Sequence, residues 1–123
     1  MDFKQLLKND FIILDGAMGT MLQAAGLEAG GIPELLNITD SELIENIHKK
    51  YIEAGSDIVY ANTFGANRYK LKNHSVDEII GAGIAIAKRA CNGKALAALD
   101  IGPIGQLLEP TGTLKFEEAY DIF

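Results

Sequence analysis

Residues 11–20 read FIILDGAMGT, and this stretch decides the fold that the sequence predicts. Its leading apolar residues run without interruption, which is typical of a strand that a parallel sheet buries on both faces. Asp15 follows at once and enters a turn that contains glycine. Because packing alone does not require a carboxylate at the end of a buried strand, the pattern indicates a functional site there.

The same arrangement recurs twice further along the chain. Residues 57–61 (DIVYA) lead into Asn62-Thr63-Phe64-Gly65, and residues 95–99 (ALAAL) lead into Asp100-Ile101-Gly102-Pro103. We therefore expect three strands, each followed by a polar residue and a glycine. In parallel α/β folds the chemistry sits at the carboxyl ends of the strands, so Asp15, Asn62 and Asp100 should lie at one edge of the sheet.

Two amphipathic helices are expected between these strands. The first covers residues 41–54, where Thr39 and Glu42 form an S/T-x-x-E capping box. The second, with the same box at its start, runs from Ser75 to Gly93. Strands that alternate with helices form βαβ units, which require a parallel sheet with right-handed crossovers.

Shorter helices are expected near both ends of the chain. One covers residues 3–9, and the other begins near Lys115 and continues to the last residue. The apolar residues expected on one face of the second are Phe116, Ala119, Tyr120 and Phe123. The length of 123 residues is that of one ordinary domain. The last predicted helix reaches the end of the sequence without a cap, which favours a truncated domain.

Composition and charge narrow the classes of function. The net charge is −6 and the basic residues are scattered, so no nucleic-acid partner is expected. No apolar run approaches the roughly 18 to 20 residues of a membrane span, and the N-terminus lacks the layout of a secretion signal, which predicts a cytoplasmic protein. The single cysteine, Cys91, excludes an internal disulfide and fits a reducing compartment.

Several segments resemble the homocysteine S-methyltransferase family, in order and over essentially the whole chain. They are LDGAMGT (residues 14–20), PELLN (33–37), EAGSD (53–57), NTFGAN (62–67) and DIGPIG (100–105). Within the family, the chain most resembles the N-terminal homocysteine-binding domain of cobalamin-dependent methionine synthases. The resemblance implies a (β/α)8 barrel, for which about 250 residues are typical. Residues 1–123 would supply its N-terminal part, with about three βα units.

The resemblance also implies cofactors that this chain does not hold. Family members activate homocysteine with zinc bound by three cysteines from the later part of the barrel, because the thiolate rather than the thiol is the nucleophile. The methyl group comes from methylcobalamin, which methyltetrahydrofolate recharges on other domains. Cys91 lies on a predicted helix and is not expected to bind metal. We expect no metal ligand, no catalytic residue and no bound cofactor in the chain, and no activity of the chain alone.

What the chain is expected to contribute is part of the homocysteine pocket. The resemblance assigns to it Asp15, Gly16, Ala17, Asn62, Thr63 and Phe64, and the position of Asp100 after the third predicted strand adds that residue. Backbone N–H groups of Gly16 and Ala17 suit the substrate carboxylate, because glycine permits close approach and such turns form anion nests. Asp15 would receive the ammonium group or orient the loop.

Three of these residues also have a plainer structural role open to them. Asp15 could cap the helix that follows, Asn62 could satisfy a backbone group at the strand end, and Asp100 could form a turn. His48 is expected at a polar helix position and His74 before a helix, both without a site role. Met18 and Met21 are expected to pack, and the Gly-x-x-Gly stretches lack the full dinucleotide fingerprint.

Alternative functions remain open at this point. Within the family, the methyl donor could be another compound such as S-methylmethionine, and a fusion to a methylenetetrahydrofolate reductase domain is also open. Outside it, the chain could be a non-catalytic module that self-associates through the open edges of its sheet. A complete flavodoxin-like domain is disfavoured because it normally needs about five strands.

Overall fold

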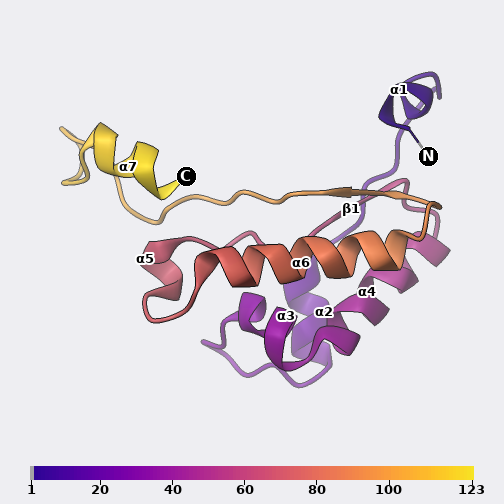
Figure 1. The fold of residues 1–123 in the computed structure, drawn as a ribbon, viewed down its shortest axis with the longest axis horizontal. Helices are drawn as coiled ribbons and strands as arrows, with labels where there is room; N and C mark the ends of the chain where they lie inside the picture. Colours follow the sequence, from indigo (N-terminus) through magenta and orange to yellow (C-terminus); the bar gives the residue numbers. More distant parts are fainter. Residues whose placement is uncertain (1) are drawn as a thin grey trace.

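The computed structural model describes residues 2–123. Its elements are α1 (Phe3–Leu6), α2 (Met18–Ala24), η1 (Pro33–Leu35), α3 (Leu36–Thr39), α4 (Ser41–Glu53), β1 (Ile58–Tyr60), α5 (Arg68–Leu71), α6 (Val76–Cys91), β2 (Leu96–Ala98) and α7 (Phe116–Ile122). Helices α2, α3, α4 and α6 gather on one side of the extended segments, and α1 and α7 lie at opposite ends (Figure 1). None of the helices in these residues has the length and apolar character needed to cross a membrane.

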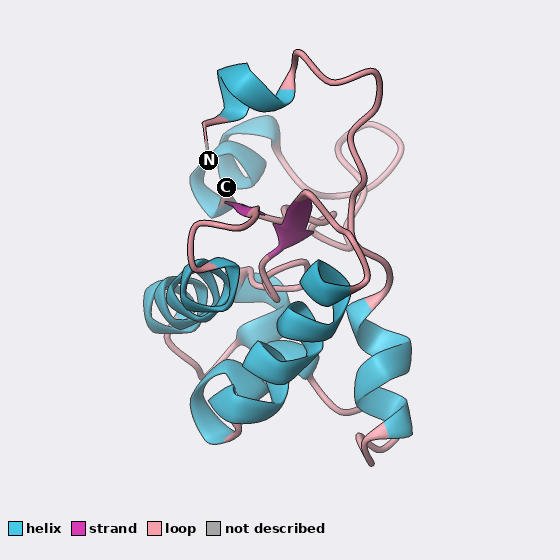
Figure 2. Cartoon of the chain, turned by 90° about the vertical axis from the view of Figure 1, so that its right-hand side faces the viewer, coloured by secondary structure: helices cyan, strands magenta, loops and turns pink. Residues whose placement is uncertain are grey.

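The sheet is small and parallel. Strands β1 and β2 pair in register, with Ile58 opposite Leu96 and Tyr60 opposite Ala98. Helix α6 connects them and packs against both, so β1, α6 and β2 form one βαβ unit. The parallel arrangement predicted from the alternation of strands and helices is confirmed, and Figure 2 shows the two strands above most of the helices.

The segment 11–14 differs from its prediction as a strand buried on both faces. It runs beside β1, where Asp57 N donates to Ile13 O at 2.7 Å, but only Leu14 forms a parallel bridge, with Ile58. Phe11 is 72% exposed and Leu14 is 48% exposed. The predicted parallel direction is correct. The predicted burial is wrong, because the helices cover the sheet on one side and leave these side chains open to solvent.

The two long helices begin and end close to the predicted residues, with one different cap. Asp40, not Thr39, caps α4, because its Oδ1 accepts from Leu43 N at 3.2 Å. Thr39 instead donates its hydroxyl to Leu35 O, so the predicted capping box is wrong. Ser75 caps α6 as predicted, accepting from Glu78 N at 3.3 Å.

The predictions for the two terminal helices are also corrected, in the end of one helix and the buried face of the other. Helix α1 ends at Leu6, short of the predicted residue 9. On α7 the buried side chain is Ala119, whereas Phe116, Tyr120 and Phe123 are exposed. Ala119 packs with Ile104 and Leu114 of the preceding loop, which is a cluster too small to cover three aromatic rings.

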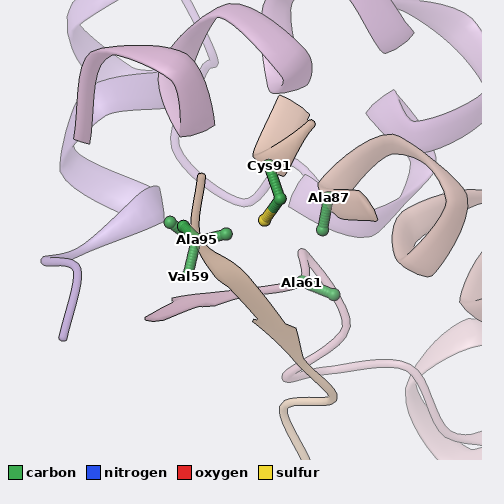
Figure 3. Packing of buried hydrophobic residues seen from close by; sticks show 5 residues of the cluster. All are labelled: Val59, Ala61, Ala87, Cys91 and Ala95. Atoms are coloured by element: carbon green, nitrogen blue, oxygen red, sulfur yellow. The ribbon is translucent and has the colours of Figure 1, made fainter. Parts of the chain in front are cut away.

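The core lies between the sheet and the helices. Val59 and Ala61 point from the β1 side toward Ala87 and Cys91 of α6, with Ala95 completing the cluster (Figure 3). A second cluster joins α2, α4 and α6; its buried members are Leu22, Ile44, Ile47 and Ile86. Cys91 therefore packs as a small apolar side chain.

His48 contradicts its predicted polar position. Its side chain on α4 is 0% exposed, and neither ring nitrogen has a hydrogen-bond partner among residues 2–123. Burial lowers the pKa of His48 to about 4, because the charged imidazolium loses its water. The sequence pattern did not predict this burial, because a histidine between Ile47 and Lys49 is typical of the boundary between the apolar and polar faces of a helix.

Candidate functional site

A cavity of about 150 Å³ lies where the extended segments end. Its lining residues are Asp15, Gly16, Ala17, Met18, Tyr60, Ala61, Asn62, Thr63, Phe64 and Asp100. Every residue that the sequence assigned to a site is therefore found around one space. They meet because segment 11–14, β1 and β2 run in the same direction, so that the loops after them open at the same edge.

Asp15 is held against the end of β1. Its Oδ2 accepts from Tyr60 N at 3.1 Å, and it does not cap α2, which begins at Met18 after Ala17 without a side-chain cap. Burial raises the pKa of Asp15, the Tyr60 N–H opposes that rise, and the nearby charge of Asp100 adds to it. Asp15 is thus an acid in a partly desolvated position with one fixed hydrogen bond.

The turn after Asp15 is shaped by a tyrosine from α4. Tyr51 Oη donates a hydrogen bond to Ala17 O at 2.9 Å. A Cβ on Gly16 would lie 2.9 Å from Tyr51 Oη. Gly16 is therefore required by the close approach of the ring. Within residues 2–123, the backbone N–H groups of Gly16 and Ala17 donate no hydrogen bond.

Asn62 takes part in a buried amide pair. Its Nδ2 donates to Pro33 O and to Asn37 Oδ1, both at 2.9 Å. Asn37 Nδ2 returns a hydrogen bond to Asn62 O at 2.8 Å and donates another to Ile79 O at 3.1 Å. The plainer role foreseen for Asn62 is therefore present, since its amide binds the backbone. Its Oδ1 accepts no hydrogen bond from the described residues and remains available.

Thr63 and Phe64 connect the end of β1 to the segment after β2. Thr63 Oγ1 donates to Asp100 O at 2.8 Å and accepts from Asp100 N at 3.1 Å. Gly102 N donates to Phe64 O at 3.0 Å. A side chain at Gly102 would collide with that carbonyl oxygen, so glycine is needed for this close approach. The Phe64 ring is 53% exposed and has Lys70 Nζ 5.6 Å from its centroid.

Asp100 borders the cavity with its backbone held by Thr63. Burial raises the pKa of Asp100, and the charge of Glu34 raises it further. The cavity lining contains two carboxylates and no basic side chain. Such a site favours a cationic group over an anionic one near its acids.

Glu34 was not assigned a role by the sequence. Its side chain is 6% exposed, and its Oε1 accepts from Gly65 N at 2.6 Å. The available signal was an acid within the apolar run of residues 32–36, inside the PELLN segment. A buried carboxylate is rare without a partner, and that partner lies 31 positions away in the chain.

The described residues do not form a metal site. Within residues 2–123, no group of three or more His, Cys, Asp or Glu side chains is placed to hold an ion. Burial raises the pKa of Cys91, with a further contribution from the charge of Asp15, so the thiol disfavours the thiolate that binds zinc. The donor set around the cavity consists of oxygen atoms and backbone N–H groups.

The chain is similar to known methyltransferases. A family model described as homocysteine S-methyltransferase matches residues 12–123. The methionine synthase of Mycobacterium tuberculosis (strain ATCC 25618 / H37Rv) is 40% identical over 103 residues, covering 74% of this chain. That of Mycobacterium leprae (strain TN) is 38% identical over 103 residues, with the same 74% covered. The chain spans 8% of the length of each of these relatives.

The fold is similar to solved structures of the homocysteine methyltransferase MmuM from Escherichia coli. The metallated form aligns with a TM-score of 0.72 and 24% identity, covering 83% of this chain and 41% of that one. The oxidized form aligns with a TM-score of 0.74 and 23% identity, covering 85% and 42%. At this identity the likeness concerns the fold, and it extends to part of that enzyme.

Proposed function

Since the chain belongs to the homocysteine S-methyltransferase family, we propose that it supplies part of the homocysteine pocket of an enzyme that forms methionine. The observation that supports this proposal is that one cavity is lined by Asp15, the turn after it, residues 62–64 and Asp100 together. In the same proposal, residues 1–123 are the N-terminal part of a (β/α)8 barrel. The parallel βαβ unit, with segment 11–14 beside β1, has the arrangement that such a barrel repeats.

The two ends of an amino acid would bind to different parts of the cavity. The ammonium group would lie between the carboxylates of Asp15 and Asp100, where opposite charges attract in a partly desolvated space. The carboxylate would accept hydrogen bonds from the free N–H groups of Gly16 and Ala17, as an anion does in a nest of backbone amides. Asn62 Oδ1 is a further acceptor for the ammonium group.

Activation of the thiol is assigned to other parts of the parent protein. Family members use zinc to generate the thiolate, but the residues described here offer no zinc ligand set. We propose that the zinc ligands, the methylcobalamin and the methyltetrahydrofolate all act from outside residues 1–123. The chain alone would then bind homocysteine without methylating it.

Amide NMR of the chain during titration with homocysteine tests this proposal. The expected result is a saturable shift of the Gly16, Ala17 and Phe64 amides, while the amides of α4 and α6 keep their positions. Homoserine, which replaces the thiol with a hydroxyl, should give the same shifts, because the chain is proposed to bind the amino and carboxylate groups. Shifts confined to exposed residues far from the cavity would contradict the proposal.

A matched pair of variants makes the titration more specific. Asp15→Asn removes the charge beside the cavity, and Asp10→Asn removes the same charge from an exposed position outside it. We expect the first to weaken binding by about ten- to a hundredfold, which is the range for losing a charged hydrogen bond. The second should bind as the unchanged chain does. Equal effects of the two variants would indicate a nonspecific response to net charge.

A further inference from the structure

Glu34 is buried and does not belong to the cavity lining. It belongs to η1, and its carboxylate accepts the hydrogen bond from Gly65 N at 2.6 Å. A buried carboxylate is costly unless donors compensate for the lost water. Hydrogen bonds from backbone N–H groups to an ionised acceptor are among the stronger ones in proteins. The contact is therefore expected to restrain the backbone of residue 65.

Gly65 fits this contact because it has no side chain. A Cβ built on it would lie 2.7 Å from Glu34 Oε1 and 3.1 Å from Glu34 Cδ. The carboxylate thus occupies the space that any larger residue at position 65 would need. Glycine and glutamate are adapted to each other across a wide separation in sequence.

Segment 34–37 holds both ends of the loop 62–65 through hydrogen bonds. At its start, Asn37 Nδ2 donates to Asn62 O at 2.8 Å, and Asn62 returns a hydrogen bond to Asn37. At its end, Glu34 binds Gly65 N. Thr63 and Phe64, which line the cavity, lie between these two points. Thr63 also donates a hydrogen bond to Asp100 O, which joins the loop to the segment after β2.

From this geometry we propose that Glu34 is a positioning residue. Its carboxylate keeps the loop 62–65 in the shape in which Asn62, Thr63 and Phe64 line the cavity, and it does so without touching the ligand. The consequence for homocysteine rests on the proposed function, whereas the effect on the loop does not.

Two variants at Glu34 and one control separate positioning from general stability. Glu34→Ala removes the acceptor, and Glu34→Gln keeps an oxygen acceptor of the same reach without the charge. Glu45→Ala removes a carboxylate that instead pairs with Lys49 and Arg89 at the surface of α4. Amide hydrogen exchange, followed by NMR on the whole chain, reports the protection of Gly65 and of the α6 core separately.

We expect exchange at Gly65 to be roughly tenfold faster in Glu34→Ala, the factor for losing one such hydrogen bond. Glu34→Gln should restore most of the protection, and the amides of α6 should exchange equally in all variants. Unchanged exchange at Gly65 in Glu34→Ala would overturn the proposal. So would a uniform increase over the whole chain, because that would indicate a purely structural role.

Homocysteine titration of the same variants then tests the link to the site. If the unchanged chain binds, Glu34→Ala should bind about tenfold more weakly and Glu34→Gln nearly normally. Equal binding by all variants would overturn the role of Glu34 in the pocket. If the unchanged chain does not bind, the proposed function of the chain fails, while the exchange at Gly65 still decides whether Glu34 positions the loop.

Discussion

The hydroxyl of Tyr51 donates a hydrogen bond to the carbonyl oxygen of Ala17 across 2.9 Å. The tyrosine belongs to α4, and the carbonyl belongs to the turn that borders the cavity, so a helix on the outside of the sheet shapes the site. The ring also approaches Gly16 so closely that a Cβ there would lie 3.0 Å from Tyr51 Cε1.

This contact makes position 16 sensitive to a single methyl group. Gly16→Ala should displace the Tyr51 ring, break its hydrogen bond and destabilise the chain by about 1 to 3 kcal/mol, the typical cost of overpacking. Gly19→Ala is the matched control, because a Cβ at that position would meet no atom of the described residues within 4 Å beyond its chain neighbours and its own helix backbone. It lies in α2, where alanine favours the helix, so urea unfolding should show equal or greater stability. Equal losses in both variants would refute the contact.

The carboxylate of Asp15 should strengthen homocysteine binding and lower the free energy of unfolding at neutral pH. Burial raises the pKa of Asp15, so the folded chain holds this proton more tightly than the unfolded chain does. The contribution of this group to the free energy of unfolding therefore falls as the pH rises from the ordinary aspartate pKa of 3.8 through the raised pKa. Asp15→Asn should be more stable than the unchanged chain at neutral pH and should bind homocysteine more weakly. A variant that loses both stability and binding would contradict this account.

Because His48 is buried, we expect the free energy of unfolding to fall in weak acid. Its pKa of about 4 in the folded chain lies below the ordinary value of 6.5. The unfolded chain therefore binds the proton first, and stability declines as the pH falls from 6.5 toward 4. The loss should approach about 3 kcal/mol, from 1.36 kcal/mol for each pH unit between the two values.

Urea unfolding at a series of pH values measures this decline. His48→Leu should flatten the dependence on pH in that range, because it removes the buried base. His74→Gln, at an exposed position, should keep the full dependence. A decline that survives in His48→Leu would assign the acid sensitivity to other groups.

The charge of Glu34 should be detectable at Asp100. After burial, the second cause that raises the pKa of Asp100 is this charge. Glu34→Gln removes the charge and keeps the acceptor for Gly65, so the pKa of Asp100 should fall in this variant. Carboxyl carbon NMR of Asp100 during a pH titration measures the change, with Glu45→Ala as the control that should leave it unaltered.

Open edges of the sheet should cause self-association of the chain. Segment 11–14 leaves Phe11 exposed on one side of β1, and beyond β2 Ile101 is 65% exposed. Exposed strand edges with apolar side chains are templates for further pairing. Sedimentation should therefore give a mass above 13.3 kDa that rises with concentration. Phe11→Lys should lower it, and a constant monomer mass for the unchanged chain would refute this expectation.

Local signals in the sequence were sufficient for much of the fold. Three predictions rest on signals between neighbours in the chain: the periodicity and Ser75 cap of α6, the apolar runs of β1 and β2, and the parallel direction of the strands. The structure agrees with all three. The failed predictions of burial depended on distant contacts, whereas the cap of α4 differs by a single position, Asp40 in place of Thr39. Burial of segment 11–14 needs a second covering layer, and burial of His48 depends on how α4 packs against its neighbours.

The sequence by itself determined the family, the βαβ order and the positions at which the strands end in polar residues. The order of the elements and the strand ends are local properties, because capping, periodicity and turn formation act over a few residues. The family follows from short segments spread along the chain. Only the tertiary structure decided that Glu34 binds Gly65 and that Tyr51 holds the turn after Asp15. Such contacts join residues 31 and 34 positions apart. They exist because folding brings separate loops to the same edge of the sheet, where no pattern of neighbouring residues specifies the partner.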